Sequence, residues 1–435
     1  MTAAAIAGLI LFIGVALYLI VGAPISISVG IASVLAMFSI LGFENALQTS
    51  AQRMFTGMNS FTLLAIPFFI LAGVIMNNGG IATRLVNCAK VVAGRMPGSL
   101  AQTNVLANMM FGSISGSAVA AAAAVGSTMA PMQEKEGYDK GFSAAVNIAS
   151  APTGMLIPPS NTLIVFSLVS GGTSIAALFM AGYIPGILWG LGCMAVAFII
   201  AKKRGYRSDA RVPFKTAIKT FIDAIPSLLL IVIVIGGIIR GVFTATEGSA
   251  IAVVYALLLS FIYRTIKIKD LPRILTESAR TTAIVIFLIG VSTIMSWVMA
   301  YTGIPGLIAD ALLGFTDNMV VILIIMNIVL LIVGTFMDPT PAILIFTPIF
   351  LPIALNFGMD PVHFGIMVVF NLSIGTITPP VGPVLFVGTR VAKLKMEQVI
   401  KPLLPFFVVT FAVLMLVTYI PALSLWIPEL LGFIK

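Results

Sequence analysis

Long apolar segments separated by short polar loops recur along the whole chain, for example at 5–21, 225–239, 283–300 and 406–420. A helix needs about 20 apolar residues to cross a bilayer, and these segments reach that length with their flanks. Strands of a membrane barrel would alternate polar and apolar residues, and these segments do not. The pattern therefore predicts an all-α integral membrane protein.

The same pattern predicts about ten membrane-spanning helices in two halves. They lie at about 5–21, 24–43, 61–78, 141–168 and 175–200, then at about 221–240, 247–263, 281–302, 361–388 and 402–422. Two further apolar segments, 99–132 and 319–354, are interrupted near 112–117 and 334–339. We expect each of the two to enter and leave the membrane on one side as a re-entrant hairpin, with its tip at the interruption.

The segment 333–386 repeats the segment 111–165, about 221 residues upstream. Both copies carry helix-breaking residues at matching places, namely Gly112 and Gly334 (within one residue), Gly154 and Gly375, and Pro158-Pro159 and Pro379-Pro380. Five crossings per half make the second copy inverted. Paired breaks in an inverted repeat indicate a transporter whose site lies between the repeats, because unwound backbone at membrane depth survives only where it is buried or lines a cavity.

Charge gives the orientation of the segments. Hydrophobic residues make up 60% of the chain and charged residues 9%, against about 25% charged in soluble domains. The long polar stretch 201–220 is rich in Lys and Arg, which marks the cytoplasmic side, whereas no Lys or Arg lies between Gly303 and Gly388. The net charge of +9 therefore reflects topology and not a nucleic-acid partner, and both termini should lie outside.

Two amphipathic segments connect these elements. The stretch 79–97 predicts a helix along the inner surface, and 303–315 its outer counterpart. Such arms could brace a moving unit against a fixed one, although ordinary loop helices are an equal alternative. We divide the chain into a transport unit, 98–168 and 319–388, and a scaffold, 1–97, 169–318 and 389–435.

The first hairpin tip concentrates small oxygen-bearing residues, with Ser113, Ser115 and Ser117 beside Gly112 and Gly116. Glycines let the backbone turn tightly and leave carbonyls and hydroxyls directed into a cavity. Carbonyl ends of half-helices suit Na⁺, while their N-terminal ends suit an anionic substrate. The alternative is a packing face of small residues between helices.

Both broken crossings add further oxygens, because each proline frees a backbone carbonyl one turn back. The predicted sodium ligands are Gly112, Ser115, Ser117, Thr153, Gly154, Pro158, Gly334, Asp338, Gly375, Thr376 and Thr378. The predicted substrate contacts are Ser117, Ser160, Asn161, Thr340, Pro379 and Pro380. We expect two or more Na⁺ ions and no other metal or cofactor.

Asp338 is the one acidic residue near the centre of a predicted hairpin, where a carboxylate is costly and is a functional candidate. It could instead cap a half-helix that starts at Pro339, or do both. Thr244 and Glu247 have the spacing of a capping box and predict a helix start. Asn147 and Asn371 lie inside crossings, where we expect them to hold the unwound backbone.

Enzyme chemistry is not expected. No Gly-Lys-Ser/Thr phosphate loop is present for a nucleotide, and His363 is the single histidine. A channel or a structural scaffold would need a continuous polar pore rather than broken hairpins.

The motifs together resemble the large membrane subunit of tripartite ATP-independent periplasmic (TRAP) transporters over nearly the whole chain. They are Gly-Ser-Ile-Ser-Gly-Ser at Gly112, Pro-Pro-Ser-Asn at Pro158, Glu-Ser-Ala-Arg-Thr-Thr at Glu277, Asp-Pro-Thr-Pro at Asp338 and Gly-Thr-Ile-Thr-Pro-Pro-Val-Gly at Gly375. The resemblance implies sodium-driven import of an organic acid, of the sialic-acid or C4-dicarboxylate class, by an elevator-type movement in a bacterial inner membrane. Among the branches of the family, the chain is taken as closer to the sialic-acid one.

The resemblance also implies two partners, a periplasmic substrate-binding protein and a small four-helix membrane subunit. We expect the small subunit to be a separate chain, since no extra helices precede Met1. The alternative is a stand-alone sodium-coupled carboxylate transporter that works without a binding protein.

Overall fold

The computed structural model describes residues 3–94, 96–206, 213–316 and 318–434, and within these ranges every regular element is a helix. Eight of the described helices are long and apolar enough to cross a membrane. Six of them coincide with predicted single crossings, and the other two are the arms of the second hairpin. Large side chains such as Val408 and Ile262 are about 70% exposed, as expected for surfaces that face lipid. The all-α membrane class is confirmed.

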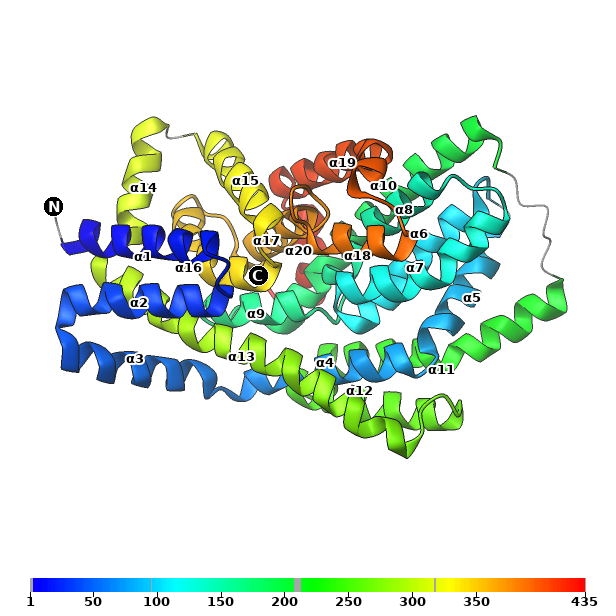
Figure 1. Ribbon diagram of the computed structural model, residues 1–435, viewed down its shortest axis with the longest axis horizontal. Coiled ribbons are helices and arrows are strands. Elements are labelled where there is room, and N and C mark those ends of the chain that lie inside the picture. The colour runs from blue at the N-terminus through cyan, green and yellow to red at the C-terminus, as the bar shows by residue number, and fades with distance from the viewer. Residues whose placement is uncertain (1–2, 95, 207–212, 317, 435) are drawn as a thin grey trace.

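One layer of the molecule is a set of long helices packed around α13 (Leu271–Thr302), which contacts α2, α3 and α4. The other members are α1 (Ala3–Ile20), α2 (Ile25–Leu41), α3 (Phe43–Met58), α4 (Ala65–Asn78), α11 (Phe214–Ile239) and α12 (Ala245–Ile262). Figure 1 shows α3, α4, α12 and α13 along one long edge of the molecule. We call this layer the scaffold layer.

Two features of this layer were not predicted. The sequence showed no helix at α3, because its polar residues make it too hydrophilic for a crossing; it buries only Ala46 and Ser50. Helix α13 begins ten residues before the predicted crossing, since charged residues extend it beyond its apolar part. The capping box of Thr244 and Glu247 at the start of α12 is confirmed.

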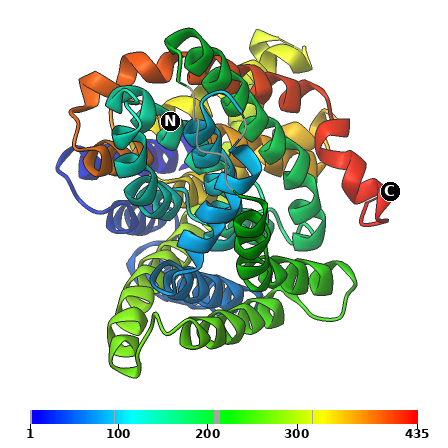
Figure 2. The same ribbon diagram turned by 90° about the vertical axis from the view of Figure 1, so that its right-hand side faces the viewer.

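The second layer holds both copies of the repeat, and we call it the hairpin layer. The first copy consists of α6 (Ser99–Ser115), α7 (Ala118–Lys135), α8 (Lys140–Ser150), the short η2 (Ala151–Met155) and α9 (Asn161–Val169). The second consists of α15 (Met319–Phe336), α16 (Pro339–Asn356), α17 (Pro361–Gly375) and α18 (Pro383–Ala392). Helix–turn–helix pairs and interrupted helices therefore lie at both predicted places, and the re-entrant course of the two hairpins stays a prediction. Figure 2 shows, from a second direction, α4, α12 and α13 of the scaffold layer below the hairpin layer.

The helices α10 (Ile175–Arg204), α19 (Met396–Tyr419) and α20 (Ala422–Leu430) complete the hairpin layer. Helix α10 packs against α6, α17, α19 and α20, and α19 packs against α8 and α17. Their packing partners therefore differ from those of the scaffold layer. The division between fixed and moving units stays a prediction.

Two short helices connect the layers where amphipathic arms were predicted. Helix α5 (Ile81–Ala93) packs between α6 and α11, and α14 (Ile304–Phe315) contacts α16 as well as α13 and α1. Arg84 of α5 pairs with Asp223 of α11 at 3.2 Å and lies 3.4 Å from the ring centre of Tyr263. These contacts attach the first arm to the scaffold layer. Whether the arms brace a moving unit stays a prediction.

Candidate functional site

The site is built on two pairs of glycines that bring backbone against backbone. A β-carbon on Gly112 would lie 2.7 Å from the Cα of Gly154, and one on Gly334 would lie 3.1 Å from the Cα of Gly375. Each pair joins the first arm of a hairpin to the broken helix of the same copy. The matched breaks of the repeat therefore meet within each copy, and any side chain at these glycines would separate them.

The first tip is a tight turn between α6 and α7. Gly116 takes a φ of +61° and its N–H donates to the carbonyl of Gly112 at 2.8 Å. Ser117 caps α7 by accepting from the N–H of Ala120 at 3.3 Å. The Ser115 hydroxyl lies 3.5 Å from the Gly112 carbonyl and 3.4 Å from the Ser117 carbonyl, both long for an O–H donor. The turn therefore brings several oxygen atoms together, and the hydrogen bonds between them are weak.

The second tip places a carboxylate where the first has a serine. Asp338 occupies the N-cap position of α16, followed by Pro339, but its side chain makes no capping hydrogen bond. The side chain is exposed. The capping role that the sequence left open is therefore not seen, and the carboxylate is directed elsewhere.

The first break is enclosed. Every residue from 151 to 160 is buried. The Ser160 hydroxyl donates to the carbonyl of Met155 and lies 2.8 Å from the hydroxyl of Thr162, while the Thr153 hydroxyl donates to the carbonyl of Ser150 at 2.7 Å. Pro158 lies within this buried segment.

The second break is more open. Thr376 is buried, but Thr378 and Pro379 are half-buried and Pro380 is exposed. The hydroxyls of Thr376 and Thr378 each donate at 2.7 Å to carbonyls of α17, those of Ser373 and Ile374. Both Pro-Pro peptide bonds, at 158–159 and 379–380, are cis.

Buried asparagines tie each hairpin to its broken helix. Asn108 of α6 donates to the side-chain oxygen of Asn147 at 3.1 Å, and Asn147 donates to the carbonyl of Ala122 on α7 at 2.9 Å. In the second copy Asn371 donates to the side-chain oxygen of Asn327 at 2.7 Å. Asn147 and Asn371 were expected to hold the unwound backbone. They hold the hairpin arms instead, because they lie on intact helix before each break.

Both tips and both breaks border one cavity of about 510 Å³. Of the predicted site residues, those that line it are Ser115, Ser117, Asn161, Asp338, Thr340 and Thr376. The two copies thus meet at a common space, as the repeat predicted. The roles of these residues in binding stay predictions.

The other predicted residues do not line this cavity. They are Gly112, Thr153, Gly154, Pro158, Ser160, Gly334, Gly375, Thr378, Pro379 and Pro380. The glycines instead set the close approach of the chains, and the Thr153 and Ser160 hydroxyls satisfy local carbonyls.

Sequence reasoning missed the wall contributed by the scaffold layer. Gly73, Val74 and Asn77 of α4 and Glu277 and Thr281 of α13 line the same cavity. A β-carbon on Gly73 would lie 3.1 Å from the carbonyl oxygen of Ser115, so α4 runs directly against the first tip. Glu277 could have been recognised from the sequence, because a charged residue at the entrance of a predicted crossing is a candidate site residue.

This geometry defines a class, a multi-pass helical membrane transporter with paired hairpins around a central site. The chain matches the family "Tripartite ATP-independent periplasmic transporter, DctM component" over residues 12–423 and belongs to it. It is therefore a TRAP transporter large permease of the inner membrane and not an enzyme.

The similarity to curated relatives extends over nearly the whole of this chain. It is 55% identical to protein YgiK of Salmonella typhimurium, over 97% of both chains. It is 42% identical to the isethionate TRAP transporter permease protein DctMQ of Oleidesulfovibrio alaskensis, over 96% of this chain and 66% of that one. It is 39% identical to the sialic acid TRAP transporter large permease protein SiaM of Vibrio cholerae, over 95% and 97%. A sialic-acid branch is thus one reading among several.

A solved structure shares the fold. The crystal structure of the Alcanivorax borkumensis YdaH transporter superposes with a TM-score of 0.63 over 89% of this chain and 90% of that one, at 14% sequence identity. This likeness shows the architecture alone.

Proposed function

We propose that the chain is the sodium-coupled translocation subunit of an importer for a small organic acid. One observation carries the proposal, the single cavity bordered by both hairpin tips and both broken helices. Oxygen-bearing residues from the two copies, Ser115 and Ser117 on one side and Asp338 and Thr376 on the other, line it together. Hard monovalent cations favour such oxygen ligands.

The charge of the cavity supports cation coupling. The residues that line it include two carboxylates, Asp338 and Glu277, and no Lys or Arg among those described. An organic anion that entered alone would meet like charges in a medium that screens them poorly. Bound Na⁺ would offset the charge of the two carboxylates, so the anion and the cations should bind together.

The N-terminal ends of two helices would add to the attraction for an anionic substrate. Helices α7 and α16 begin next to the cavity at Ala118 and Pro339, directly after the two tips. The N-terminal end of a helix carries a partial positive charge and free N–H groups, which favour carboxylate or sulfonate oxygens. Two such ends, one from each repeat, would hold the anion between the ions.

Movement completes the proposal. We expect the two copies of the repeat to travel as one body past α4 and α13, which form the opposite wall of the cavity. Because α10 and α19 pack against α6, α8 and α17, we now include both in the moving body.

A periplasmic substrate-binding protein and a small membrane subunit are the proposed partners. The substrate class rests on the names of relatives, whose substrates include isethionate and sialic acid, both small organic anions. The stand-alone alternative predicts uptake without any binding protein.

The test is uptake by proteoliposomes that contain the chain and its small subunit, with purified binding protein outside. Isethionate, sialic acid and C4-dicarboxylates form the panel, and each is tried under a sodium gradient and under a proton gradient alone. We expect uptake of one class only with sodium and only with the binding protein. Equal rates under the two gradients would contradict sodium coupling, and full rates without the binding protein would favour the stand-alone transporter.

A further inference from the structure

A second groove lies away from the central cavity, where α10 ends and α19 begins. It has a volume of about 700 Å³. Its walls carry four cationic side chains and two carboxylates, namely Lys140, Lys203, Arg204, Lys401, Asp139 and Glu397. None of these residues belongs to the central site.

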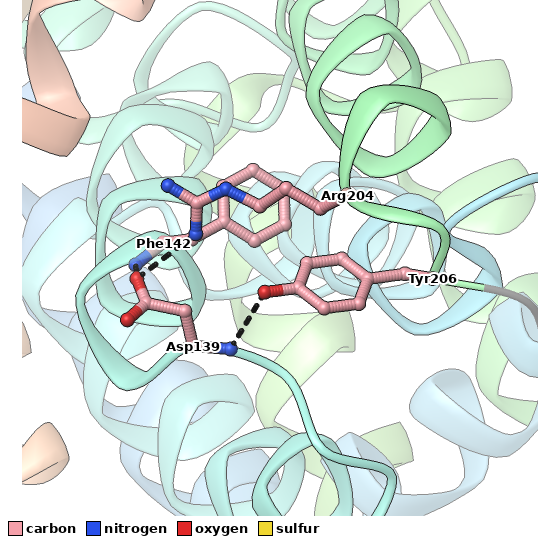
Figure 3. Close-up of polar contacts among 4 residues, drawn as sticks. All are labelled: Asp139, Phe142, Arg204 and Tyr206. Atoms are coloured by element: carbon pink, nitrogen blue, oxygen red, sulfur yellow. Dashed lines mark hydrogen bonds and ion pairs between the residues drawn. The ribbon is translucent and has the colours of Figure 1, made fainter.

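Two of the four cations are already paired. Arg204 lies 3.2 Å from Asp139, and Figure 3 shows this pair held from the other side by Tyr206, whose hydroxyl accepts from the Asp139 N–H at 3.0 Å. Lys140 pairs with Glu134 at 2.8 Å. In the described part of the chain, Lys203 and Lys401 take part in no ion pair, and Glu397 is the one carboxylate of the groove without one. The groove therefore presents an excess of positive charge.

The same groove has an apolar side. Ile200, Leu394 and Pro405 also line it. Beyond it, Ile199 of α10 and Leu404 and Val408 of α19 are 53%, 53% and 70% exposed. These exposed faces belong to two helices long and apolar enough to cross a membrane, so hydrocarbon should cover them. The cationic groove thus adjoins lipid-facing surface.

The charged end of α10 marks the membrane boundary. Its last turn holds Lys202, Lys203 and Arg204, and the predicted orientation places this end on the cytoplasmic side. Basic pockets between helices at that boundary bind the headgroups of anionic lipids.

We propose that this groove binds an anionic phospholipid, with its phosphate between Lys203 and Lys401 and its acyl chains along the exposed faces of α10 and α19. A free phosphate would use the two lysines but not the apolar faces. The lipid would join α10 to α19, the two helices that pack on the repeat, and so would stabilise their contact.

The test uses the full chain in detergent, titrated with phosphatidylglycerol, phosphatidylcholine or glycerol 3-phosphate while its melting temperature is recorded. Phosphatidylglycerol should raise the melting temperature, and the double substitution K203Q/K401Q should weaken its apparent affinity roughly 25-fold, about fivefold for each lysine. The matched control is K219Q/K269Q, which removes two exposed lysines from the predicted cytoplasmic side outside the groove. It should respond as the wild type does.

Three results would overturn the proposal. They are an unchanged affinity in K203Q/K401Q, an equal response to phosphatidylcholine, and an equal response to glycerol 3-phosphate, which would make the ligand a free phosphate. All four lysines are exposed, so both variants should fold, and their melting temperatures without lipid check this.

Discussion

The two broken helices share one backbone plan but lie in different surroundings. In the first copy every residue from 151 to 160 is buried, and Gly182 and Gly186 of α10 pack directly on Leu156 and Ile157. In the second copy the corresponding turn emerges at the surface, with Val381 38% exposed.

The two hairpin tips differ in the same way, since the first is the more buried of the two. The first ends in small serine side chains, with Ser115 buried and Ser117 half-buried, and the second ends in an exposed carboxylate, Asp338. The comparison teaches that the two copies share what the backbone requires, the glycine contacts, and that each has its own asparagine tie, while the side chains around them differ. Architecture and chemistry can therefore be tested separately.

The largest effect should come from the shared architecture. Gly154→Ala would place a methyl group against the backbone of Gly112, and Gly375→Ala would do so against Gly334. Backbone cannot move aside as a side chain can, so each change should cost more than the ~1–3 kcal/mol of ordinary overpacking and should abolish folded protein. Size-exclusion profiles and melting temperatures measure this.

Gly236→Ala is the control, because a β-carbon there meets nothing within 4 Å and the residue is helical. It should leave the protein intact. Tolerance of alanine in one copy alone would break the equivalence of the two copies.

The chemistry of the second tip gives the next effect. Asp338→Asn keeps the shape of the side chain but removes its charge, and no capping bond is lost. We expect uptake to fall at least about tenfold, which corresponds to about 1.4 kcal/mol, with the melting temperature unchanged. Asp360→Asn is the matched control. Asp360 caps α17 by accepting from the N–H of Val362 at 2.7 Å, and Asn caps about as well as Asp. If Asp338→Asn takes up substrate at the wild-type rate, the Asp338 carboxylate has no role in binding or coupling.

The chemistry of the first tip should give the smallest effect. Ser115→Ala removes one hydroxyl from a turn that also offers carbonyls, so the apparent sodium affinity should fall about tenfold and the maximal rate should change little. Uptake as a function of sodium concentration measures it. Ser127→Ala is the control on α7, where the hydroxyl donates to the carbonyl of Ala124 within its own helix. If both variants need the same sodium concentration as wild type, the first tip is a packing surface.

Sequence reasoning predicted the repeat, and six of the predicted site residues line the cavity, because both depend on local signals. Glycine, proline and serine inside apolar segments interrupt a helix wherever they occur, so the hairpins, the breaks and the residues Ser115, Ser117 and Asp338 could be read directly. Helix α3 could not, since its mixed composition resembles a loop.

Long-range packing was the other limit. The wall formed by α4 and α13 depends on which surfaces of distant helices meet, and no local pattern encodes that. The packing of α10 and α19 against the repeat is a further contact between distant helices that no local pattern encodes. Residues that face a cavity also cannot be told from residues that only shape it, as Gly112 and Gly154 illustrate.

The central claim is that both copies of the repeat move as one body against the wall of α4 and α13. A reversible cross-link across the cavity tests it most directly. One cysteine replaces Val74 on α4 and one replaces Val119 on α7, both of which line the cavity, after Cys88 and Cys193 are changed to alanine. The control pair replaces Asn78 and Arg273, which bond each other at 2.9 Å within the scaffold layer.

A reducible bifunctional thiol reagent joins each pair, and sodium-driven uptake is measured at high cross-linking yield and again after reduction. The account predicts that the Val74–Val119 cross-link stops uptake, that reduction restores it, and that the control cross-link has no effect. Undiminished uptake with the Val74–Val119 cross-link complete would contradict it.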